Sequence, residues 1–87
     1  MKVSFTVDQD DRQILAVCFS LAEGKVHKTI EIAEGECYID LDAHGNPLAV
    51  EMLCPGRLEI LVKQVARKYH IHGMNTAVHG VREALAV

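Results

Sequence analysis

The stretch that decides the fold is residues 36–53, ECYIDLDAHGNPLAVEML. Apolar side chains alternate with polar ones on both sides of a turn at residues 43–46. The apolar set is Cys37, Ile39, Leu41, Leu48, Val50 and Met52. Because successive side chains of a strand point to opposite faces, this pattern predicts a hairpin with one buried face and one acidic face.

Three further segments upstream show strand patterns and are separated by short polar turns. They are residues 3–7, 13–21 and 26–32. The second is apolar on both of its faces, which predicts a strand in the middle of the sheet with both faces covered. Lys28 interrupts the apolar face of the third, which favours an edge position. Together with the hairpin, these segments predict an antiparallel β-meander of four or five strands.

The period changes from strand to helix after Pro55 and Gly56. Helical spacing places one set of apolar residues on a single face: Leu58, Leu61, Val62, Val65 and Tyr69. Gly73 fits a C-terminal cap, and Asn75 or Thr76 fits the N-cap of a second short helix. We therefore expect an α+β fold of one domain, residues 1–87. Residues 1–53 form the sheet, residues 57–87 form two helices, and the first helix packs on one sheet face.

Length and composition are those of a small globular domain. The chain has 87 residues, of which 49% are hydrophobic and 24% charged. A chain of this size has a small free energy of unfolding. Burial of apolar surface against a second copy would increase it, so we expect a homodimer. No run approaches the roughly 20 apolar residues of a membrane helix, and the first residues lack the apolar core of a signal peptide. We expect a cytoplasmic protein that does not contact a membrane.

The charges divide along the chain. Residues 1–53 carry ten acidic and four basic side chains, and residues 54–87 carry two acidic and five basic ones. An acidic sheet would therefore be followed by a basic helical tail. The two parts attract each other, or they offer partners two surfaces of opposite sign.

Three widely spaced cysteines, Cys18, Cys37 and Cys54, form no Cys-x-x-Cys pair. Neither a zinc knuckle nor a thioredoxin motif is therefore present. Cys18 and Cys37 lie in apolar strand patterns and are expected to behave as small hydrophobic residues.

A series of short motifs runs in a fixed order through residues 3–53. It comprises Gly24-Lys25-Val26, Thr29, Glu31, Gly35, Asp40-Leu41-Asp42, Gly45 and Val50-Glu51. In this order and spacing the chain resembles the YuzE-like family of small prokaryotic domains of unknown function. It departs from the family pattern at Arg12 and Gln13, where members tend to carry Asp, and at Ala49, where they tend to carry Gly. The resemblance implies a compact β-rich fold, no established activity and, for some members, a toxin-like partner.

Residues 40–51 follow the spacing of an EF-hand calcium loop, with a histidine at the third ligand position. Both flanks alternate as strands instead of helices, and Pro47 lacks a backbone N–H that such a loop needs. We therefore do not expect calcium. Asp40, Asp42 and Glu51 are still expected to share an outward sheet face. That face is either simply solvated or a site for a divalent ion or a basic partner.

His70 and His72 are a second candidate metal pair. On an extended segment both rings would point the same way, with His79 approaching from the second helix. The alternative, which we favour, is that these histidines lie at a helix end and are stabilised there by its dipole. The sequence therefore predicts no metal or other cofactor.

Nothing in the sequence predicts catalysis, because it contains no Gly-x-Ser-x-Gly elbow and no phosphate-binding glycine loop. The leading hypothesis is a non-enzymatic interaction module that binds a second copy or a small, toxin-like partner through apolar surface at Met74, Val78 and Leu85. The alternative is a metal- or small-ligand-binding domain that uses the acidic hairpin face or the histidines. DNA binding through the basic tail is less favoured, because the net charge is −3.

Overall fold

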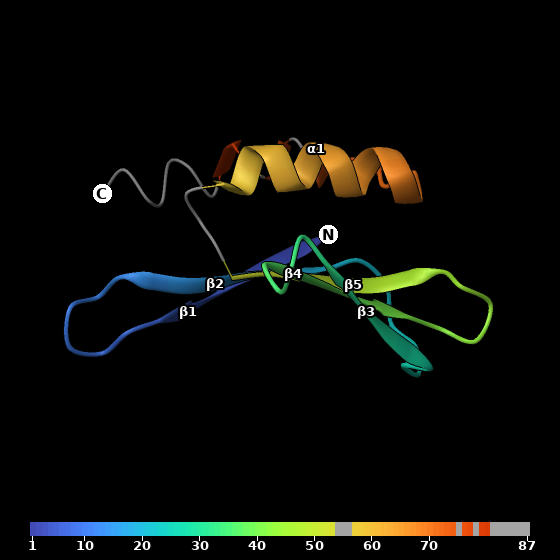
Figure 1. Ribbon diagram of the computed structural model, residues 1–87, viewed down its shortest axis with the longest axis horizontal. Helices are drawn as coiled ribbons and strands as arrows, with labels where there is room; N and C mark the ends of the chain where they lie inside the picture. Colours follow the sequence, from blue (N-terminus) through green and yellow to red (C-terminus); the bar gives the residue numbers. More distant parts are fainter. Residues whose placement is uncertain (54–56, 75, 78, 81–87) are drawn as a thin grey trace.

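The computed structural model describes residues 1–53, 57–74, 76–77 and 79–80. The helix α1 lies above one face of a five-stranded antiparallel sheet (Figure 1). The elements are β1 (Lys2–Val7), β2 (Ile14–Ser20), β3 (Lys28–Ile32), β4 (Cys37–Leu41), β5 (Pro47–Met52) and α1 (Leu58–Tyr69). The predicted α+β class is confirmed, and no helix in the described part of the chain is long and apolar enough to cross a membrane.

The strands are ordered β1-β2-β5-β4-β3 across the sheet. β3, β4 and β5 form the predicted meander, and β3 lies at an edge as its lysine indicated. The prediction of a meander in sequence order throughout is wrong, because β2 pairs with β5 and not with β3. This order places β5 between two apolar strands, so that Val50 pairs with both Phe19 and Ile39, and none of the three side chains is exposed.

β2 lies one place from the sheet edge, between β1 and β5. Its residues Val17 and Phe19 point into the core and have no exposed surface. On its other face, Cys18 is only half-buried. The expectation that both faces of this strand are covered is therefore not met by the described elements, since α1 lies on one side of the sheet only (Figure 1).

α1 packs on the sheet through the predicted apolar face. The buried residues of this helix are Leu58, Leu61, Val62 and Val65, which join the core of the sheet. α1 ends earlier than predicted, because His70 adopts the left-handed conformation (φ 54°, ψ 45°) and its N–H bonds to the carbonyl of Ala66. Gly73 is therefore not the cap of α1, although it also has a positive φ of 87°.

A second helical segment follows Gly73. Its described residues Met74, Thr76, Ala77, His79 and Gly80 are helical. The N–H of Ala77 donates to the carbonyl of Gly73 at 3.0 Å. The rest of the predicted second helix, with its Asn75 N-cap candidate, lies outside the described residues.

The turn between β4 and β5 is the one that the sequence predicts. The carboxylate of Asp42 accepts the backbone N–H of His44 at 2.9 Å and that of Asn46 at 2.8 Å. Gly45 takes a positive φ of 82°, which glycine adopts without steric cost. Residues 36–53 thus form a β-hairpin and not a loop between two helices.

Candidate functional site

The sheet face opposite α1 carries a shallow pocket of about 310 Å³. We call this surface the open face. It is lined by Cys18, Thr29, Tyr38, Asp40, Ala49 and Glu51. Four strands contribute to it, and none of the described lining residues is basic.

Strand register explains the composition of the open face. Glu51 of β5 lies between Tyr38 of β4 and Cys18 of β2. Asp40 of β4 lies between Thr29 and Ala49 in the next row. The hollow forms because Cys18 and Ala49 have small side chains. The larger polar side chains of the lining surround it.

Asp40 is held in place by a hydrogen bond across the strands. The hydroxyl of Thr29 donates to Oδ1 of Asp40 at 2.7 Å. This bond orients the carboxylate on the open face. The sequence prediction that Asp40 and Glu51 share an outward face is therefore confirmed.

Asp42, the third predicted acid of this face, has a different role. Its carboxylate accepts hydrogen bonds within the β4–β5 turn, and it does not line the pocket. The backbone N–H of Asn46 is the largest cause of a lowered pKa for Asp42, and the backbone N–H of His44 acts in the same direction. Its carboxylate therefore stabilises the turn.

The environment of Cys18 keeps its side chain a thiol. Burial raises the pKa of Cys18, and the negative charges of Glu51 and Asp40 raise it further, against a smaller effect of the Ser4 hydroxyl. A cysteine nucleophile needs the opposite shift, because the thiolate is the reactive form. In the core, burial raises the pKa of Cys37 to about 11. The expectation of a small hydrophobic residue is met at Cys37, whereas Cys18 lines a polar surface.

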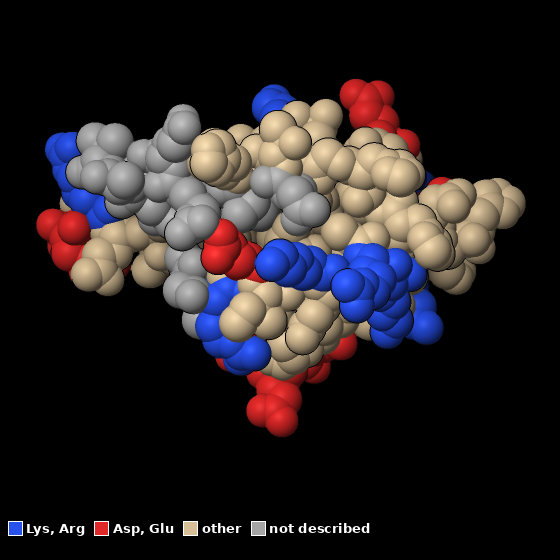
Figure 2. All heavy atoms as spheres, turned by 90° about the horizontal axis from the view of Figure 1, so that it is seen from above, with Lys and Arg blue, Asp and Glu red and all other residues tan. Residues whose placement is uncertain are grey.

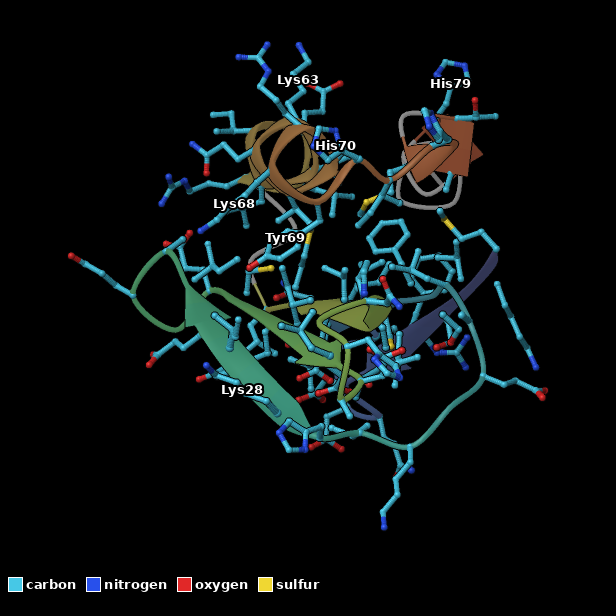
Figure 3. All side chains as sticks on the ribbon, turned by 90° about the vertical axis from the view of Figure 1, so that its right-hand side faces the viewer. Lys28, Lys63, Lys68, Tyr69, His70 and His79 are labelled. Atoms are coloured by element: carbon cyan, nitrogen blue, oxygen red, sulfur yellow. The ribbon has the colours of Figure 1, made fainter. Side chains whose placement is uncertain are left out.

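The histidine candidates do not converge. His70 ends α1 and His72 is exposed on the following turn. Figure 3 shows His70 beside the helix and His79 on the separate second segment, with clear space between them. Among the residues that the structure describes, no three His, Cys, Asp or Glu side chains are grouped so that they could hold a metal ion.

Met74 is not a surface residue. It has no exposed surface and belongs to the hydrophobic core. The prediction of an exposed apolar surface is therefore wrong at Met74, because the chain folds back after His70 and adds this side chain to the core. The other two residues of that prediction, Val78 and Leu85, lie outside the described residues.

Large apolar side chains are exposed elsewhere. Within the described part of the chain they are Met1, Phe5, Val7, Leu15, Val26, Leu53 and Ile60. Three of them, Phe5, Val7 and Leu15, belong to β1 and β2. These two strands extend toward their turn beyond the first residues of α1 (Figure 1). The sequence suggested no role for this part of the sheet.

The outward side of α1 is basic. A second shallow pocket of about 500 Å³ lies there, lined by Ile60, Lys63, Gln64, Arg67 and Lys68. Figure 2 shows Lys and Arg side chains gathered on this side of the molecule, and Figure 3 shows Lys63 pointing away from the sheet. The predicted charge separation is therefore present as two surfaces, because the basic side of α1 and the acidic open face lie on opposite sides of the sheet.

Sequence reasoning found the two carboxylates of the open face but missed Cys18, Thr29 and Tyr38. Cys18 and Tyr38 each lie between two apolar residues and Thr29 precedes Ile30, so their outward direction was readable. The sequence did not show that these side chains come together, because that depends on which strands are neighbours and on the register between them.

Comparisons of the chain with protein-family models, with curated proteins and with solved structures found no match. The resemblance to the YuzE-like family therefore stays a prediction.

Proposed function

We propose that this chain is a small non-enzymatic protein-interaction module whose open face binds a basic segment of a partner protein. The observation that carries the proposal is the pocket on the uncovered side of the sheet. Its lining combines the carboxylates of Asp40 and Glu51 with the side chains of Thr29 and Tyr38, and none of the lining residues that the structure describes is basic. Such a surface attracts lysine and arginine side chains and disfavours acidic partners.

The chemistry of the pocket supports binding over catalysis. Cys18 is the side chain there with nucleophilic potential, and the neighbouring carboxylates raise its pKa. The Thr29 hydroxyl already donates its hydrogen to Asp40. The raised pKa leaves Cys18 in the thiol form, which is a poor nucleophile. The bond from Thr29 holds the Asp40 carboxylate in place on the open face, which suits the binding of a cationic group.

The resemblance to the YuzE-like family extends the proposal to the kind of partner. A small, toxin-like protein with a basic surface would match the charge of the open face. Neutralisation of such a partner would require affinity and no chemical step, which agrees with the composition of the pocket.

The test begins with capture of partners by the tagged full-length chain from native cells. Each candidate partner is then purified, and its affinity is measured by titration calorimetry. We expect Asp40→Asn and Glu51→Gln each to weaken binding about tenfold or more, because a charge pair at the interface is lost. The matched control is Glu23→Gln, which removes an exposed carboxylate outside the pocket. Equal affinities for all four proteins would show that the open face is not the binding site.

A second candidate function, binding of a small cationic ligand, uses the same pocket. The observation in its favour is that two carboxylates flank a hollow large enough for a small molecule. A bare metal ion has less support, because the described residues supply no group of three suitable ligands. Calorimetric titration with divalent ions and with a short diamine distinguishes these options. Binding heat for the diamine or an ion that is present in the wild type and lost in Glu51→Gln would favour a small cationic ligand. No binding heat in the wild type would eliminate this candidate function.

The basic side of α1 supports nucleic-acid binding less well. Lys63, Arg67 and Lys68 lie together there, but the whole chain carries a net charge of −3. Nonspecific binding to a polyanion depends on the number of phosphates neutralised and weakens steeply with salt. No mobility shift of duplex DNA at low salt would exclude this role.

A further inference from the structure

β1 is an edge strand with little protection against pairing. It lies at one end of the sheet order, so alternate residues direct backbone N–H and C=O groups outward. Its sequence from Lys2 to Val7 contains no proline and one charged residue. The opposite edge, β3, is one residue shorter and carries both Lys28 and Glu31. β1 is therefore the edge at which another strand can be added.

The strand also leaves apolar side chains uncovered. Phe5 is 39% exposed and Val7 46% exposed. Phe5 pairs with Val17 of β2, so it lies on the α1 side of the sheet. The helix covers the middle of the sheet and not this end (Figure 1). The register shift between β1 and β2 leaves Leu15 of β2 as the unpaired residue, so β1 itself keeps a regular geometry.

The sequence of this strand is complementary to itself. Residues 2–8, which are β1 and the residue that follows it, read KVSFTVD. When two copies are aligned antiparallel about Phe5, Lys2 meets Asp8, Val3 meets Val7, Ser4 meets Thr6 and Phe5 meets Phe5. The pairs within β1 are favourable, since apolar meets apolar and hydroxyl meets hydroxyl. Lys2 has the opposite charge to Asp8, whose carboxylate also accepts the N–H of Asp10 in the turn after β1.

We propose that β1 is a homodimer interface in which two copies pair antiparallel, with the two-fold axis at Phe5. A two-fold interface uses the same patch on both copies, which a self-complementary strand supplies. The pairing satisfies outward backbone groups on both edges and covers Phe5 and Val7. It joins the two sheets with both α1 helices on one side. This inference concerns a different surface from the open face and does not depend on the proposed partner.

Sedimentation velocity of the full chain over a range of concentrations tests the association. We expect a reversible dimer, and Phe5→Lys should weaken it about tenfold or more, because it places two like charges opposite each other. Ile60→Lys is the matched control, since Ile60 is 53% exposed on α1, and it should leave the dimer unchanged. A wild-type monomer at all concentrations, or equal dimerisation of the two variants, would overturn the inference.

Disulfide cross-linking tests the register and remains decisive if Phe5→Lys fails to fold. In the proposed register, the residues at position 5 are directly opposite, about 5 Å apart, which suits a disulfide. The residues at position 6 are diagonal neighbours about 7–8 Å apart, which is too far. Mild oxidation should therefore link Phe5→Cys to itself through position 5, as identified by peptide mass spectrometry, and should not link Thr6→Cys to itself. The reverse result, or no link at either position, would contradict the proposed pairing. Either outcome leaves the function of the open face to its own test.

Discussion

Nη1 of Arg57 lies 2.9 Å from Oε1 and 2.7 Å from Oε2 of Glu36, and so contacts both carboxylate oxygens. Arg57 directly precedes α1, and Glu36 directly precedes β4. The backbone carbonyl of the same glutamate also accepts the N–H of Leu53 at 2.8 Å. Glu36 therefore links the beginning of α1 to both strands of the β4–β5 hairpin. This contact is an ion pair between the acidic sheet and the basic helical part of the chain.

The Arg57–Glu36 pair should contribute modestly to stability. Its two side chains are 49% and 30% exposed, so water and salt screen the attraction. We expect Glu36→Gln to lower the free energy of unfolding by about 0.5 kcal/mol, and by less at high salt. Urea denaturation at low and high salt measures the effect. Glu23→Gln is the matched control, and equal stabilities of the two variants at low salt would show that the pair contributes nothing.

Met74 should behave as a core residue. Because its side chain has no exposed surface, Met74→Ala leaves a cavity in the core, to which α1 and the sheet both contribute. We expect a loss of about 2 kcal/mol or more in the free energy of unfolding. Ile60→Ala is the control, since Ile60 is 53% exposed and its truncation should cost little. Comparable losses for the two variants in urea denaturation would contradict the placement of Met74.

Asp42 should make stability depend on pH in the acidic range. Hydrogen bonds to its ionised carboxylate, first from the N–H of Asn46, lower its pKa in the folded protein. Its contribution is therefore fully present above the ordinary pKa of an aspartate. It is lost as the pH falls through the lower folded value. The difference in unfolding free energy between wild type and Asp42→Asn should shrink over that range.

Chemical denaturation at a series of pH values from about 6 to about 2 measures this difference. Asp10→Asn is the comparison variant, because Asp10 belongs to the other acidic turn and donates its N–H to Asp8. A difference for Asp42→Asn that stays constant with pH would show that its carboxylate does not stabilise the folded state through ionisation.

Cys18 should report the charge of the open face. Burial and the charges of Glu51 and Asp40 raise its pKa, so alkylation by iodoacetamide should be slow near neutral pH. Glu51→Gln removes one of these charges. The pH profile of alkylation at Cys18 should then move to lower pH, whereas Glu23→Gln should leave it in place.

Peptide mass spectrometry separates this reaction from labelling at the other cysteines. Cys37 has no exposed surface and a pKa of about 11, so it should react only after unfolding. An unchanged profile for Cys18 in Glu51→Gln would mean that the two side chains do not interact across β2 and β5.

The elements could be predicted because their signals are local. Alternation through Cys37, Ile39 and Leu41 identified β4 and its buried side, and the spacing of Leu58, Leu61 and Val65 identified the core side of α1. Polar outward positions on the same strands also placed Asp40 and Glu51 on one surface. The end of α1 was mispredicted, because a left-handed histidine replaced the expected glycine cap.

The order of the strands and the cross-strand neighbours of each residue could not be predicted from local sequence patterns. Nothing in the pattern of β2 distinguishes β3 from β5 as its neighbour, since each has apolar side chains in alternation. Cys18 meets Glu51 only because β2 and β5 are adjacent. The burial of Met74 likewise depends on how the chain turns after α1.

The sequence by itself determined which residues form strands and the helix, where the hairpin turns, and which side of each element is apolar. These properties follow from periodicity and turn chemistry over a few neighbouring residues. Only the tertiary structure decided the order of the strands, the residues that meet on the open face and the exposure of the β1 edge. These depend on contacts between residues far apart in the chain, which are selected by the burial of the whole apolar surface and not by any local pattern.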